Sequence, residues 1–225
     1  FVYNNLGIGS TEIQHIAIDK ENKIVTAGQN KWQVDYDNII INKFFPNGQV
    51  DSSFGTNGYV DLSVGYSIVR QTFIAIDNNN KYIIIGNGNS DIFIARLNEN
   101  GTYDETFGNQ GIFRYALPSM GSYTGDNYVQ SFHLYPDNSV GIAIYDEFSS
   151  VWPPINYQAK GLIKISEQGK LDSTYGENGE VLTFLSESAF FIPNGRSDKG
   201  MGYDSDGNSY VVANDKDDSS VVGIL

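Results

Sequence analysis

The sequence predicts an all-β fold built from repeated four-stranded units. Glycine is abundant, at 24 of 225 residues, and aromatic residues make up 13 %, nearly all of them Tyr and Phe. Hydrophobic residues reach 40 % and charged residues only 18 %, which is enough to build a core and is not typical of a disordered acidic chain. This composition favours strands and turns over a helix bundle.

One motif repeats three times along the chain. It has the form G-x-x-D-x-x-[FY]-G-x-x-G, and its aspartates are Asp51, Asp104 and Asp172. We expect each carboxylate to accept hydrogen bonds from backbone N–H groups of a turn, with the aromatic residue packed between sheets and the glycines in left-handed turns. An active site is needed once and not in every unit, so the repetition indicates a structural role.

Cations recur eight residues before each aspartate, at Lys43, Arg96 and Lys164. We expect them to pair with carboxylates or backbone carbonyls between neighbouring units.

A second pattern predicts the strands themselves. Apolar segments flank short polar turns whose equivalent positions are Asn22, Asn80, Asn138 and Gly207. Asn and Gly tolerate the positive φ that a tight hairpin requires. In the first unit the pattern predicts strands over 12–18, 23–28, 38–45 and 57–62.

Four-stranded sheets of this size cannot bury both faces alone, and radial stacking solves that problem in a β-propeller. We therefore predict a β-propeller, or a segment of one, with about four repeats of four-stranded antiparallel blades. The units span about 6–62, 63–115, 116–184 and 185–225, the last incomplete, within a single domain over 1–225. Residues 1–5 could supply an outer strand that closes a four-bladed ring. We favour the alternative, a piece of a longer chain that forms a wider ring.

The motif, placed after a strand that ends Ile94-Ala95-Arg96-Leu97, resembles the bacterial delta-60 repeat of β-propellers, whose layout is similar to that of NHL propellers. The resemblance covers nearly the whole chain, with Tyr175 in place of the usual Phe and no motif in the last unit. It implies a modular bacterial protein that is secreted or held at the cell surface. It implies no settled activity.

The net charge of −13 argues against nucleic-acid binding, which needs a basic surface, and disfavours anionic membranes. No cysteine is present, which excludes disulfides, zinc–thiolate sites and thiol catalysis. No apolar run is long enough for a membrane span. These features leave a protein or a glycan as the expected partner.

If the four strands of a unit are called A to D in chain order, loop length varies only in the B–C connection and in the D–A connection to the next unit. Both connections emerge on one face of a propeller. These loops contain aromatic residues that we expect to be exposed and predict to form a partner-binding surface: Trp32, Tyr36, Tyr123, Trp152 and Tyr157. The third unit has the longest such B–C loop, over 145–158. The alternative is that these loops fold down over the blade edges as local cores.

His133 occupies an innermost-strand position where the other units carry small residues, so it could face a ligand or act as a hydrogen-bonded filler. The segment with Asp204, Asp206 and Asn208 resembles half of a calcium loop but lacks the later Glu, and it aligns with ordinary turns. We therefore predict no metal site, no cofactor and no catalytic residue.

The sequence predicts a non-enzymatic, exported or cell-surface binding scaffold that presents aromatic loops to a protein or glycan. One alternative is a propeller-fold glycan lyase or hydrolase, which needs acid/base groups near the axis. Another is a structural spacer in a large surface protein, which should have short and uniform loops.

Overall fold

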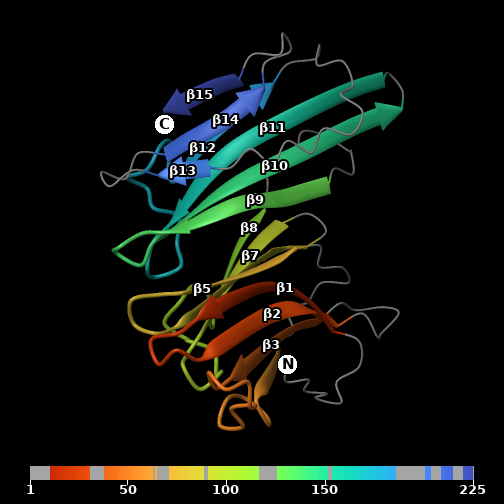
Figure 1. Cartoon of the computed structure of the whole chain (residues 1–225). Coiled ribbons are helices and arrows are strands. Elements are labelled where there is room, and N and C mark those ends of the chain that lie inside the picture. Colours follow the sequence, from red (N-terminus) through yellow and green to blue (C-terminus); the bar gives the residue numbers. More distant parts are fainter. Residues whose placement is uncertain are drawn as a thin grey trace. The chain divides into compact units, whose positions relative to one another are not determined.

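The computed structural model of the chain describes residues 11–30, 38–62, 64, 71–88, 91–116, 126–151, 154–185, 201–203, 209–214 and 220–224. These residues form strands, turns and bends, and no helix occurs among them (Figure 1). Accordingly, none of the described residues belongs to a helix that could span a membrane. The all-β prediction is confirmed for this part of the chain.

The strands form four antiparallel sheets, and the order of strands in each sheet follows the chain. The first sheet contains β1 (Thr11–Ile18), β2 (Ile24–Asn30), β3 (Asn38–Phe44) and β4 (Tyr59–Leu62). The second contains β5 (Thr72–Ile76), β6 (Tyr82–Asn87), β7 (Asp91–Leu97) and β8 (Ile112–Ala116). The third contains β9 (Asp126–Leu134), β10 (Val140–Val151), β11 (Pro154–Ile165) and β12 (Glu180–Leu185). The fourth contains β13 (Met201–Tyr203), β14 (Ser209–Asn214) and β15 (Ser220–Ile224).

The chain divides into two compact units, Phe1–Leu117 and Pro118–Leu225. The first unit holds the first and second sheets, and the second unit holds the third and fourth. Each unit therefore combines two consecutive repeats.

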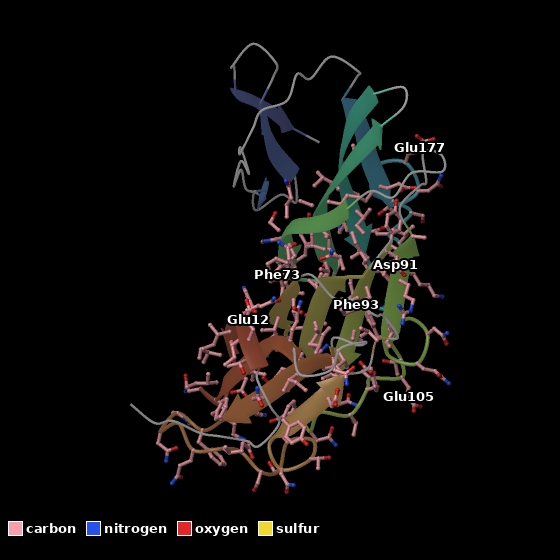
Figure 2. The ribbon with its side chains drawn as sticks, turned by 90° about the vertical axis from the view of Figure 1, so that its right-hand side faces the viewer. Glu12, Phe73, Asp91, Phe93, Glu105 and Glu177 are labelled. Atoms are coloured by element: carbon pink, nitrogen blue, oxygen red, sulfur yellow. The ribbon has the colours of Figure 1, made fainter. Side chains whose placement is uncertain are left out.

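The core of the first unit lies between its two sheets. Strand side chains alternate between faces, and the first sheet contributes the alternate residues Val25, Ala27, Ile39 and Ile41, all fully buried. The second sheet faces them with residues of β6 and β7, including Ile84, Phe93, Ala95 and Leu97. Phe93 lies within this packing, whereas Glu105 points outward from a turn (Figure 2).

The predicted turn residues adopt the predicted conformation. Asn22, Asn80 and Asn138 have φ values of 61°, 60° and 63°. In the first sheet Asp19 Oδ1 accepts hydrogen bonds from the backbone N–H groups of Glu21 and Lys23, at 3.0 and 2.8 Å. The second sheet repeats this arrangement at Asp77, which caps the N–H groups of residues 79 and 81 at 2.8 Å each.

A glycine permits a close approach of the two sheets in the first unit. Gly101 has φ +88°, and a Cβ placed there would lie 2.7 Å from Val60 Cγ2. Beside it, the carbonyl of Asn100 accepts a hydrogen bond of 2.8 Å from the N–H of Gly55 in the first sheet. A side chain at residue 101 would therefore separate the two turns that carry the repeated motif.

The third sheet departs from the expectation of a long loop over 145–158. β10 continues to Val151 and β11 begins at Pro154, so this stretch is an extension of the hairpin and not a loop. Aromatic and β-branched residues are frequent on both arms, among them Tyr145, Phe148 and Ile155, and such residues favour strands. The loop prediction was wrong because it interpreted the greater length of this connection as an irregular insertion, whereas the extra residues lengthen both strands.

Candidate functional site

The repeated aspartates hold the turns that join the third and fourth strands of each full sheet. In every copy Oδ1 accepts from the backbone N–H and the hydroxyl of the residue two positions later, which is Ser53, Thr106 or Thr174. The N–H···O distances are 3.2, 3.2 and 3.1 Å. The predicted capping role is confirmed.

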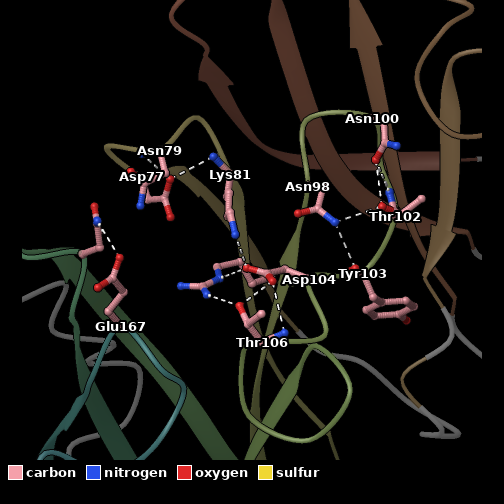
Figure 3. A network of polar contacts seen from close by, with 12 residues as sticks. Asp77, Asn79, Lys81, Asn98, Asn100, Thr102, Tyr103, Asp104, Thr106 and Glu167 are labelled. Atoms are coloured by element: carbon pink, nitrogen blue, oxygen red, sulfur yellow. Dashed lines mark hydrogen bonds and ion pairs between the residues drawn. The ribbon is translucent and has the colours of Figure 1, made fainter.

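The second carboxylate oxygen of each repeated aspartate binds a cation. Asp51 Oδ2 lies 2.8 Å from Lys23 Nζ, and Asp172 Oδ2 lies 3.3 Å from Lys164 Nζ. Asp104 Oδ2 binds both Lys81 Nζ at 2.5 Å and Arg96 Nε at 2.7 Å (Figure 3). All six carboxylate oxygens of the three motif aspartates thus bind partners within the protein.

These contacts hold the aspartates in the charged state. Burial raises the pKa of Asp104, but hydrogen bonds from Lys81 and Thr106 and the charge of Arg96 outweigh it and leave the pKa well below its usual range. For Asp51, burial is likewise outweighed by Lys23 and Ser53, and its pKa is lowered. A general acid needs a proton near neutral pH, so these carboxyl groups do not suit that role.

Lys43 differs from the other two repeated cations because it crosses between sheets. Its Nζ donates to the Tyr82 hydroxyl of the second sheet at 2.5 Å and lies 3.2 Å from Asp19 Oδ2. The Tyr82 hydroxyl donates in turn to the same Asp19 oxygen at 3.3 Å. The Lys43 side chain is 2 % exposed and that of Asp19 is 0 % exposed, so a closed ionic cluster is buried where the sheets meet.

The expectation that the repeated cations reach carboxylates or backbone carbonyls of a neighbouring repeat is confirmed for Lys43, whose Nζ also donates to the Glu99 carbonyl at 3.5 Å. Arg96 and Lys164 instead bind the motif aspartate of their own sheet. The guanidinium of Arg96 binds Asp104 beside Lys81 and also donates to the Thr106 hydroxyl at 3.3 Å. Sequence reasoning missed Tyr82, although a tyrosine in a buried isoleucine strand needs a hydrogen-bond partner and could have signalled one.

The second sheet lacks the counterpart of the ion pair that Asp19 makes in the first sheet. Asp77 occupies the position of Asp19, but its buried Oδ2 accepts no hydrogen bond. The cation that would serve it, Arg96, is committed to Asp104. The repeats therefore share a backbone arrangement but differ in their ion pairs.

Among the described residues, no group of three or more His, Asp or Glu could hold a metal ion.

Each histidine lies on the first strand of its sheet, His15 on β1 and His133 on β9. His133 on β9 is half-buried, and its ring meets that of Tyr135 edge-on at 4.9 Å between centroids. Burial lowers the pKa of His133. His15 on β1 accepts a hydrogen bond at Nδ1 from the N–H of Ile74 on β5, at 3.3 Å, which joins the two inner strands of the first unit. The two histidines have separate surroundings, and a ligand role for His133 stays a prediction.

The hairpin of β10 and β11 is the feature that distinguishes the third sheet. Within the described residues, β9 pairs with β10 as far as Glu147, opposite Asp126, and β12 pairs with β11 as far as Gln158, opposite Leu185. Four further pairs continue the hairpin beyond this point, from Phe148 opposite Tyr157 to Val151 opposite Pro154. Figure 1 shows both arrows extending past β9 and β12.

Most of the predicted binding aromatics lie outside the described residues, namely Trp32, Tyr36, Tyr123 and Trp152. So does the calcium candidate, with Asp204, Asp206 and Asn208. Tyr157 lies on β11 within the projecting hairpin.

Comparison with known families supports the fold. A family model described as "Domain of unknown function (DUF5122) beta-propeller" matches residues 78–107. The matched stretch runs from the turn before β6, through β7, to Phe107 of the second motif copy. The chain is thus similar to a β-propeller family over part of its second repeat. The finer resemblance to the delta-60 repeat stays a prediction.

Solved structures give only distant likeness. MPT-4, a mannose phosphorylase from Leishmania mexicana solved with a phosphate ion, aligns at 10 % identity and a TM-score of 0.42, over 93 % of this chain and 65 % of that chain. A hypothetical protein from Leishmania major aligns at 9 % identity and a TM-score of 0.27, over 97 % of this chain and 86 % of that chain. At these scores neither carries an argument about this chain. No curated protein matches the sequence.

Proposed function

We propose that the chain is a non-enzymatic binding scaffold of the β-propeller type, exported or attached to the cell surface, that presents aromatic residues to a protein or glycan. The observation that carries the proposal is the hairpin of β10 and β11, whose pairing continues for four residue pairs beyond the described parts of β9 and β12. The comparable ends of the first and second sheets project by no more than one pair, as far as their described residues go.

The projecting hairpin has the composition of a contact surface. No charged residue occurs between Phe148 and Gln158, although the whole chain carries a net charge of −13. The backbone pairing sets one aromatic residue, Phe148, directly opposite another, Tyr157. Aromatic residues supply large contact area at low cost in conformational entropy. A projecting element of this kind also disfavours a plain structural spacer.

The repeated motifs support binding over catalysis. A glycan lyase or hydrolase needs an acid/base pair that faces its substrate. The three motif aspartates are instead tied to turns and cations in each full sheet. We include in the proposal that the four sheets are blades of a propeller, that the chain needs no cofactor or metal, and that its partner is neutral or basic.

The test is a binding screen on a glycan array and on an array of immobilised peptides. The parent protein is compared with the double variant Phe148→Ala/Tyr157→Ala and with Trp32→Ala and Trp152→Ala. The control is Phe45→Ala, which removes an exposed aromatic residue from a turn at the other end of the first sheet. We expect array hits to survive in the control and to weaken by at least about tenfold in the hairpin variant. Hits that persist unchanged in all the aromatic variants would contradict the proposal.

A further inference from the structure

We propose that the outer face of the first sheet docks a further four-stranded sheet of the same repeat, placed one period before the first repeat in the sequence. The outer face is the one turned away from the second sheet. On β1 it carries three isoleucines that are between 55 and 58 % exposed, namely Ile13, Ile16 and Ile18. They pair with alternate residues of β2, on the face opposite the core residues Val25 and Ala27. A run of exposed apolar side chains on one face is typical of an interaction site.

The second sheet shows how the equivalent face is covered. Ile16 and Ile18 of the first repeat correspond to Ile74 and Ile76 of the second, 58 positions later. Ile74 is 1 % exposed and Ile76 packs against the same core, because β5 lies against β1 and β2 of the first sheet. The isoleucines that face a preceding sheet in the second repeat are therefore left exposed in the first.

The turn between the first two strands carries a second part of this junction. In the second repeat the Asn80 side chain accepts a hydrogen bond from the N–H of Lys20 at 3.2 Å and donates to Glu21 Oε2 at 2.9 Å. Its counterpart Asn22 has the same left-handed backbone, with a φ of 61° against 60°, and it is exposed. The first repeat thus presents the same amide, in the same backbone conformation, to solvent.

The turn before the motif aspartate carries a third part. The carbonyl of Asn100 accepts a hydrogen bond of 2.8 Å from the N–H of Gly55 in the motif of the first repeat. Asn47 stands at the same place in the first repeat, and it is exposed. The glycines that follow these two asparagines, Gly48 and Gly101, have φ values of 82° and 88°, so the two turns have the same backbone shape. The outer face of the first sheet therefore repeats all three features by which the second sheet docks on the first.

The three contacts define the chemistry of the occupant. It offers a carboxylate at the position of Glu21 and a glycine N–H at the position of Gly55. It also has small or β-branched residues where the first sheet has Ala17, Val25 and Ala27. A sheet that carries the repeated motif supplies these groups. In the first unit the covering sheet comes immediately before the covered sheet in the chain, so the occupant is the repeat that stands one period before the first, outside residues 1–225.

The ion pairs of the occupant follow from the residue it meets. Tyr82, which completes the buried ionic cluster at Asp19, corresponds to Ile24 in the first repeat, and isoleucine has no hydroxyl group. The third sheet shows an arrangement that needs no such hydroxyl. There Lys164 binds the motif aspartate of its own sheet and lies 4.7 Å from the ring centroid of Tyr135, which stands at the position of Asp19. We expect the occupant to have this self-contained pattern.

The experiment uses the first repeat of the chain as the probe. A copy of residues 11–68, one period in length, is inserted before Thr11 of the full chain. The chain has no cysteine, so Lys20→Cys in the inserted and in the receiving repeat supplies two unique thiols for a short bismaleimide cross-linker. In the known junction the Lys20 ammonium donates to the carbonyl of Asn78, the counterpart of Lys20 in the second repeat. The parent chain with Lys20→Cys/Asn78→Cys is therefore the positive control.

We expect the inserted repeat to cross-link within one molecule to the same extent as the positive control. Ile16→Lys/Ile18→Lys in the receiving repeat should lower this cross-linking at least about fivefold, because docking would bury two ammonium groups. Both side chains are exposed in the parent chain, so the same change should leave its melting temperature and its positive-control cross-link close to the parental values. Ile24→Tyr in the receiving repeat gives the inserted ionic cluster its hydroxyl, and it should raise the melting temperature of the duplicated chain only.

Two results would overturn the inference directly. They are the absence of cross-linking even with Ile24→Tyr, and full cross-linking in the lysine variant. Sedimentation velocity tests a second copy as the occupant: association of the parent chain that Ile16→Lys/Ile18→Lys abolishes would assign the face to another molecule. A cross-link within the parent chain between Lys20→Cys and Ser205→Cys, at the equivalent turn of the last repeat, would assign it to the fourth sheet. Either result would also overturn the occupant proposed here.

Discussion

The Lys43 ammonium of the first sheet lies 2.5 Å from the Tyr82 hydroxyl of the second, and both meet Asp19 in a buried cluster. Two charges and a phenol are removed from water here, so each depends on the others for hydrogen bonds. The cluster gives the contact between these sheets a specificity that aliphatic packing alone would lack.

Replacing Tyr82 with Phe tests this cluster. The change removes the acceptor of Lys43 and a donor to Asp19 while the ring stays, and we expect the free energy of unfolding to fall by about 1–3 kcal/mol. Tyr59→Phe is the matched control, with an expected change within about 0.5 kcal/mol. Urea unfolding in a Trp152→Phe background leaves Trp32 as the single tryptophan, within the unit that holds the cluster. Equal stabilities of the two Phe variants would show that the cluster contributes nothing.

The three motif aspartates should differ in cost despite their identical sequence pattern. Asp104 has two cationic partners and a side chain 5 % exposed, whereas Asp172 has one and is 20 % exposed. We expect Asp104→Asn to lower the free energy of unfolding by about 3–5 kcal/mol, as for a broken buried ion pair. Asp172→Asn should cost about 1 kcal/mol. In variants that keep only Trp32 or only Trp152, tryptophan fluorescence during urea unfolding reports the stability of the unit that holds that residue. A larger loss of stability in Asp172→Asn than in Asp104→Asn would refute the partner assignment.

Stability should fall in acid because the same carboxyl groups have lowered pKa values. Burial opposes the lowering at Asp51 and Asp104, and their cations and Ser or Thr donors exceed it. A group whose pKa is lower in the folded state stabilises the fold above its unfolded pKa and loses that contribution as the pH drops. We therefore expect stability to hold down to about pH 5 and then to decline through pH 4 and below. The slope should be smaller in Asp104→Asn, and an unchanged slope would contradict the assignment.

The described Asn-Gly steps should resist deamidation. The reaction requires the glycine nitrogen to attack the asparagine side chain, and the glycine N–H is engaged at each step. For example, Gly58 donates to the carbonyl of Phe54 at 2.9 Å and Gly179 donates to that of Tyr175 at 2.7 Å. Peptide mapping after incubation at neutral pH should show the mass increase of deamidation at Asn57 and Asn178 in urea-unfolded protein and not in folded protein. Equal rates in the two states would mean that these turns are open.

The repeats made much of the fold predictable. The sequence was enough to place the motif aspartates, the turn asparagines and the strands of the first repeat. Each of these features depends on local chemistry that recurs at fixed spacing. The partners of the repeated cations could not, because the choice of Lys43 depends on Tyr82, 39 residues away in sequence.

The hairpin of the third sheet escaped prediction for a different reason. The pattern from Tyr145 to Gln158 fits an aromatic loop as well as two strand arms, and only pairing across the turn distinguishes them. The loops that hold Trp32, Tyr36 and Tyr123 lie outside the described residues, so their role stays a prediction.

Residue-resolved hydrogen exchange by NMR over 145–158 tests the projecting hairpin most directly. If β10 extends past β9 with one open edge, protected and fast-exchanging amides should alternate along Phe148–Val151, because successive N–H groups face β11 and solvent in turn. Amides of Ile142 and Ile144, which lie between paired strands, should be protected throughout. Uniformly fast exchange over 148–157 would show that the hairpin does not form, and uniform protection in the free protein would show that its edge is already covered.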